Sequence, residues 1–125
     1  ENYLETQEGK KLPVPHCIRN TEGWEIVDAL QGYALNTAPI DKPVFGSMDL
    51  CGILQIVDGQ TDIEKITLVG LCTDICVISN AMLLKAALPE AEIAVDASCC
   101  AGVTPESHAT ALAAMAACQI SIENQ

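Results

Sequence analysis

The sequence is poor in aromatic side chains, which limits the kind of core that it can form. Only 3% of the 125 residues are aromatic, while 50% are hydrophobic. The core must therefore be built from alanine, valine, isoleucine and leucine, which suits helices packed on a parallel sheet. A chain of this length forms one domain at most, and we expect residues 1–125 to be a single domain.

Basic side chains and long apolar runs are also scarce. The chain has 6 lysines and arginines against 17 acidic residues, a formal net charge of -11, and no basic patch. This balance argues against a nucleic-acid partner. No apolar run reaches the length of a bilayer span, so we expect no membrane partner either.

Cysteine is plentiful, but the pairing that a disulfide framework requires is missing. The seven cysteines are an odd number, and they lie inside apolar segments rather than in paired loops. Reduced thiols in a cytoplasmic compartment fit this pattern better than disulfides. No Cys-x-x-Cys pair is repeated, so a structural zinc ribbon is unsupported.

Residues 65–80 organise the rest of the chain. The aliphatic run from Ile66 to Leu71 predicts a strand that is buried on both faces. A helix with apolar spacing follows, and either Thr73 or Asp74 suits its N-cap. Cys76 then falls in the first helical turn, at the edge where open α/β sheets bind their ligands. The dipole at a helix N-terminus favours the thiolate form of a cysteine, so the sequence predicts that Cys76 is reactive. The alternative is that Cys76 is a buried, unreactive core residue.

The remaining pattern alternates strands and helices with short connections. We predict a loop over 1–23, a short helical turn at 24–30, strands at 39–45, 66–71, 92–96 and 119–122, and helices at 48–57, 74–88 and 105–118. Ser47 and the Thr104-Pro105 pair are the expected helix starts. This order indicates right-handed parallel crossovers in a three-layer α/β/α sandwich with a mostly parallel sheet.

Four segments resemble the isochorismatase-like cysteine hydrolases, and nicotinamidases in particular. The stretch Gly70-Leu-Cys-Thr-Asp-Ile-Cys76-Val is similar to the nucleophile motif of that group, and 96–102 to the segment after the next strand. Asp41-Lys42-Pro-Val-Phe45 resembles the segment with the catalytic lysine, and 12–25 the one with a metal-binding histidine. The resemblance implies a Rossmann-like hydrolase fold and a cysteine-dependent amide hydrolase.

The resemblance also assigns roles to residues. Cys76 would be the nucleophile, and the backbone N–H groups of Cys72 and Cys76 would form the oxyanion hole, with a cis peptide bond between Leu71 and Cys72. Lys42 would help to ionise the thiol; otherwise it is a solvated loop lysine. Phe45 would form an apolar wall for a flat substrate ring, although core packing explains it equally well.

A divalent metal ion is the cofactor that the resemblance implies. His16 matches the metal-binding histidine, Glu8 is a candidate ligand in the same loop, and Tyr3 stands where other nicotinamidases have a histidine. Mixed histidine and carboxylate ligands suit zinc, iron or manganese and do not choose among them. His108 is read as a structural or surface residue.

These assignments predict hydrolysis of nicotinamide to nicotinate and ammonia through a thioester on Cys76. The alternatives are another small-amide or ureido/carbamoyl hydrolase of the superfamily, or a non-catalytic remnant. The non-catalytic remnant is an alternative because the resemblance places two strands and a helix before Glu1. Those elements would carry a catalytic aspartate and an Asp-x-His metal pair. We therefore expect the domain to be N-terminally incomplete. Members of the group commonly self-associate, which leaves a homo-oligomer open.

Overall fold

The computed structural model describes residues 2–35 and 37–125, which form two compact units, 1–41 and 42–125. The described residues of the first unit form short helices: the 3₁₀ turns η1 (Tyr3–Glu5) and η2 (Glu22–Trp24), and the α-helices α1 (Gln7–Lys11) and α2 (Asp28–Ala34). The loop predicted over 1–23 is therefore wrong in part, because η1 and α1 interrupt it.

Local hydrogen bonds explain why α1 forms in a stretch that looks irregular in sequence. The Thr6 hydroxyl accepts from the Gly9 N–H at 3.0 Å and caps the helix, while the Tyr3 hydroxyl donates to the Leu12 carbonyl at 3.0 Å across it. A Cβ at Gly9 would lie 1.9 Å from the Tyr3 carbonyl oxygen, so only glycine permits this close approach.

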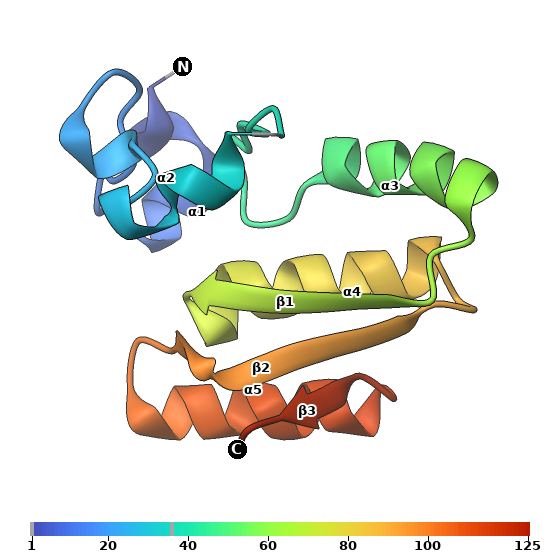
Figure 1. The fold of residues 1–125 in the computed structure, drawn as a ribbon. Helices are drawn as coiled ribbons and strands as arrows, with labels where there is room; N and C mark the ends of the chain where they lie inside the picture. The colour runs from blue at the N-terminus through green and yellow to red at the C-terminus, as the bar shows by residue number, and fades with distance from the viewer. Residues whose placement is uncertain (1, 36) are drawn as a thin grey trace. The chain divides into compact units, whose positions relative to one another are not determined.

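The second unit is a parallel three-stranded sheet with helices packed against it. Its strands are β1 (Lys65–Leu71), β2 (Glu92–Ala101) and β3 (Ser121–Glu123), in the order β1-β2-β3. Its α-helices are α3 (Met48–Thr61), α4 (Ile78–Ala87) and α5 (Pro105–Ala117), with α4 connecting β1 to β2 and α5 connecting β2 to β3 (Figure 1). The sheet and its crossover helices confirm the predicted α/β fold class.

The core lies where α4 and α5 meet β2. Ile93 and Val95 of β2 are almost completely buried, as are Leu84 of α4 and Met115 of α5. All of these side chains are aliphatic or thioether groups, as the shortage of aromatic residues requires. Burying each such side chain contributes about 1.5–3 kcal/mol.

Two helix starts, those of α3 and α5, follow the predicted caps. The Ser47 hydroxyl accepts from the Leu50 N–H at 3.1 Å and begins α3, and Thr104 begins α5 with Pro105 at its first position. Ser107 completes a capping box with Thr104. These contacts are local in sequence, which is why the pattern alone revealed them.

Several elements differ from the sequence predictions. α3 continues to Thr61, past the expected stop at Asp58-Gly59. β2 extends to Ala101 because, after an irregularity between Leu68 and Gly70, the end of β1 pairs with the Cys100 region. The strand predicted at 39–45 does not form; its two prolines lack the N–H groups that a ladder needs.

Candidate active site

The Cys76 segment leaves the carboxyl end of β1 as predicted, but it does not begin as an ordinary α-helix. The Leu71–Cys72 peptide bond is cis, and residues Thr73–Val77 form a π-helical turn, η3, before α4 begins at Ile78. The Cys72 carbonyl accepts from the N–H groups of Ile75 and Val77, both at 3.1 Å. Cys76 therefore lies on a wide turn at the sheet edge where α/β folds place their sites.

Lys42 lies directly beside this cysteine. Its Nζ is 3.2 Å from the Cys76 Sγ and 3.5 Å from the Val44 carbonyl oxygen. The thiol of Cys76 is free and only partly buried, so it is open to a small reactant. An ammonium group donating a hydrogen bond to sulfur stabilises the thiolate, which is the reactive form of cysteine.

The neighbouring Cys72 is a poorer nucleophile. Burial raises the pKa of its thiol, and the negative charge of Asp74 raises it further. A raised pKa keeps this thiol protonated at neutral pH. Of the two cysteines in the motif, the one beside Lys42 is therefore the better candidate.

The expected N-cap at Thr73 or Asp74 is wrong, because both side chains turn to the start of α5. Thr73 is completely buried, and its Oγ1 lies 2.8 Å from the Nδ1 of His108. The Asp74 carboxylate accepts from the Val103 N–H at 3.1 Å. A hydrogen bond from Ser107, with that from Val103, lowers the pKa of Asp74. These bonds tie η3 to α5.

Phe45 belongs to a bend that Asn80 of α4 holds. The Asn80 amide nitrogen donates to the carbonyl oxygens of Phe45, at 3.1 Å, and of Cys76, at 2.8 Å. Its Oδ1 accepts from the Ser47 N–H at 2.9 Å. The Phe45 side chain is half-buried. This exposure fits an apolar wall for a substrate and core packing equally well, so both interpretations stay predictions.

Sequence reasoning missed Asn80 and assigned no contact to His108. The available signal for Asn80 was an amide four residues after Cys76 in a largely apolar helix. His108 offered no comparable signal, because its partner lies 35 residues away. Both residues act through contacts that only the folded chain creates.

His16 lies in the first unit, in an exposed loop. Its Nδ1 is 2.7 Å from the Val14 carbonyl oxygen, which can only accept, so Nδ1 is the donor in this bond. The His16 and Tyr3 rings pack edge to face, with centroids 5.5 Å apart. A histidine that ligates a metal commonly donates its other ring N–H to a backbone carbonyl in this way.

The residues predicted to bind metal do not make a complete site by themselves. Within residues 2–35 and 37–125, no three histidine, cysteine or acidic side chains gather closely enough to hold a metal ion. Glu8 lies on α1 with partners of its own.

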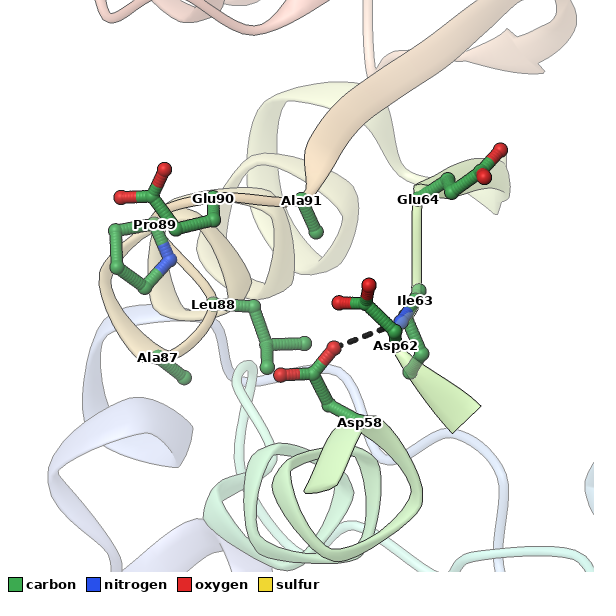
Figure 2. Close-up of a pocket in the computed structure, with 9 residues that line it drawn as sticks. All are labelled: Asp58, Asp62, Ile63, Glu64, Ala87, Leu88, Pro89, Glu90 and Ala91. Atoms are coloured by element: carbon green, nitrogen blue, oxygen red, sulfur yellow. Dashed lines mark hydrogen bonds between the residues drawn. The ribbon is translucent and has the colours of Figure 1, made fainter. Parts of the chain in front are cut away.

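A pocket of about 460 Å³ lies at the other end of the sheet, where β1 and β2 begin (Figure 2). Asp58 and Asp62 line it at the end of α3, and Glu64 and Glu90 line it just before the two strands. The pocket contains neither a thiol nor an amine. It is thus separate from the Lys42–Cys76 pair.

The described part of the chain has no helix long and apolar enough to cross a membrane.

Nearly the whole sequence resembles a known protein family. The family model "Isochorismatase domain" matches residues 1–124. No curated protein matches the sequence significantly.

Solved structures similar to this one include nicotinamidases and pyrazinamidases. Nicotinamidase/pyrazinamidase PncA from Bacillus subtilis is 24% identical, with a TM-score of 0.72 over 96% of this chain and 68% of its own. The Streptococcus mutans pyrazinamidase/nicotinamidase is 26% identical, with a TM-score of 0.73 over 91% and 65%. The Pyrococcus horikoshii pyrazinamidase, solved in complex with zinc, is 25% identical, with a TM-score of 0.70 over 98% and 68%. This chain, which spans about two thirds of each of those proteins, belongs to the isochorismatase family of hydrolases.

Proposed function

We propose that the protein is a cysteine-dependent amidase that hydrolyses nicotinamide to nicotinate and ammonia. The observation that carries this proposal is the 3.2 Å contact between the Lys42 ammonium and the Cys76 sulfur at the carboxyl end of β1. Similarity to solved nicotinamidases and pyrazinamidases supports the choice of substrate. A small, flat, neutral amide also suits a strongly acidic protein better than an anionic substrate does.

In this mechanism the Cys76 thiolate attacks the amide carbonyl carbon and forms a carbon–sulfur bond. The carbonyl oxygen becomes an oxyanion, which the backbone N–H groups of Cys72 and Cys76 stabilise; each such donor is worth about 3 kcal/mol. The carbon–nitrogen bond then breaks, and the nitrogen leaves as ammonia with the proton taken from the thiol. Water then attacks the thioester carbonyl, and the carbon–sulfur bond breaks to restore the thiolate. One water proton returns to the general base, and the other passes to solvent as nicotinate leaves.

Lys42 has an electrostatic role in this scheme. Its ammonium hydrogen bond stabilises the thiolate before attack and the negative charge that develops afterwards. The resemblance gives the proton transfer from sulfur to nitrogen to an aspartate, and no acidic residue of this sequence is assigned that role. The chain thus contributes the nucleophile, the cation and the oxyanion donors.

A divalent metal, zinc, iron or manganese, is part of the same proposal, with His16 as one ligand and Glu8 as a second candidate. The Nδ1 bond to the Val14 carbonyl supports this role because it orients the ring and leaves Nε2 as the nitrogen that would face a metal ion. A bound metal would hold the pyridine nitrogen of the substrate. Metal content after dialysis should fall in His16→Ala and stay unchanged in Glu25→Gln, an exposed control from the same unit. Equal content in wild type and His16→Ala would remove the ligand assignment.

Ammonia release from nicotinamide tests the proposal. We expect turnover by wild type and by Cys118→Ala, which removes an exposed thiol, and none above background by Cys76→Ala. Pyrazinamide and a ureido compound, assayed in parallel, separate nicotinamidase from the other amide hydrolases. Turnover that survives Cys76→Ala would contradict the mechanism, and a wild type that cleaves only the ureido compound would contradict the substrate.

A further inference from the structure

Asn80 is a buried amide that joins two segments distant in sequence. Its side chain makes three hydrogen bonds, to the Phe45 carbonyl, the Cys76 carbonyl and the Ser47 N–H, at 2.8 to 3.1 Å. Both Nδ2 hydrogens and one Oδ1 lone pair are thus engaged. An aspartate would place a negative oxygen against two carbonyl oxygens, and a leucine would satisfy none of the three groups. The position therefore requires a primary amide.

The segment that Asn80 holds is the one that carries Lys42. Lys42 precedes Phe45 by three residues, and its Nζ also contacts the Val44 carbonyl. A Cβ at Gly46 would lie 2.6 Å from the Leu83 Cδ1 of α4, which shows how closely this segment packs on the helix. Its downstream end is fixed as well, because Ser47 caps α3. The backbone on the carboxyl side of Lys42 therefore has one defined position relative to α4.

The other end of the link is the nucleophile itself. The Asn80 amide donates to the carbonyl of Cys76, the residue whose sulfur Lys42 contacts. A single side chain thus fixes the backbone of the cysteine and the backbone after the lysine. We infer that Asn80 is a positioning residue that sets the Lys42–Cys76 contact and so controls the reactivity of the thiol. This inference rests on the proposed role of Cys76, not on which amide it cleaves.

The inference predicts that Asn80 acts through Lys42. The test is the rate of Cys76 alkylation by iodoacetamide at neutral pH, resolved by peptide mass spectrometry, with the exposed Cys17 as internal reference. We expect Asn80→Leu and Asn80→Asp to slow alkylation of Cys76 by about tenfold, the effect of losing a charge-assisted hydrogen bond. Alkylation of Cys17 should not change.

The matched control is Gln55→Leu. The Gln55 amide also links α3 to α4, by donating to the Ala87 carbonyl at 3.1 Å, but at the far end of α4 from Cys76. It should leave Cys76 alkylation within about twofold of wild type, as expected for a surface change away from the site. A comparable slowing in Gln55→Leu would mean that general loosening of α4 explains the effect, and would overturn the inference.

A second comparison separates positioning from loss of structure. In a Lys42→Met background the ammonium is absent, so Asn80→Leu should change Cys76 alkylation by less than about twofold. The same tenfold effect in both backgrounds would show that Asn80 does not act through Lys42. Because iodoacetamide needs no amide substrate, this result stands even if the protein fails to hydrolyse nicotinamide. Where hydrolysis is measured, kcat should fall with little change in KM.

Discussion

The buried bond between Thr73 and His108 gives a prediction whose size follows from the structure. Thr73 is 0% exposed, and its Oγ1 lies 2.8 Å from the His108 Nδ1. Thr73→Val keeps the branched shape and removes the hydroxyl, so it leaves the imidazole nitrogen without that partner. We expect a loss of about 1–2 kcal/mol in the free energy of unfolding. For a chain of this size that is roughly 3–10 °C in Tm.

Replacing His108 instead leaves a completely buried hydroxyl unpaired. His108→Leu should therefore cost about 1–3 kcal/mol, the penalty for an unsatisfied buried polar group. When both partners become apolar, no polar group is left unpaired. The double variant should then be less destabilised than the sum of the single variants, by about 1 kcal/mol or more.

Urea unfolding of the four proteins measures this coupling. Thr110→Ala serves as a control on α5, because its hydroxyl bonds only within the helix, to the Glu106 carbonyl at 2.8 Å, and its loss should cost under about 0.5 kcal/mol. If the effects of Thr73→Val and His108→Leu simply add, the bond contributes nothing as a pair, and the tie between η3 and α5 does not depend on it.

Three further predictions concern backbone space and pH. Gly102→Ala should destabilise the protein by about 1 kcal/mol or more, because the new Cβ would lie 2.9 Å from the backbone nitrogen and Cβ of His108; thermal unfolding measures this. Gly52→Ala, inside α3 with open space around it, should instead raise stability by about 0.5–1 kcal/mol, and a drop in Tm would contradict this reading. The hydrogen bonds from Ser107 and Val103 lower the pKa of folded Asp74, so they stabilise the fold above the unfolded value of about 3.9 and are lost as pH falls below it. Asp74→Asn should thus lose stability relative to wild type at pH 7 but less at pH 3, by urea titration; a constant difference would refute the linkage.

The sequence predicts those parts of the fold that depend on residues close together in the chain. The aliphatic run of β1, the Ser47 cap and the Thr104-Pro105 start each depend on residues a few positions apart. Cys76 was placed correctly at the strand end for the same reason. Its contact with Lys42, 34 residues away, followed only from family resemblance, because spacing alone does not bring such distant residues together. The predicted burial of β1 on both faces is wrong, because its residues alternate between exposed and partly buried.

The parts that were wrong or missed depend on tertiary contacts. Thr73 and Asp74 look like helix caps, yet their side chains bond to His108 and Val103 of a later segment. The segment 39–45 looks like a strand, yet the Phe45 carbonyl at its end accepts from the side chain of Asn80, 35 residues away. In each case the local preference lost to a partner that sequence spacing does not reveal.

The proposed mechanism requires a thioester on Cys76, beside Lys42. Acid quenching of wild-type protein mixed with nicotinamide, followed by peptide mass spectrometry, detects this intermediate. We expect a nicotinoyl group on the Cys76 peptide, less of it in Lys42→Met, and none in Cys76→Ala. An acyl group on another cysteine, or substrate turnover with no acyl group on Cys76, would contradict it.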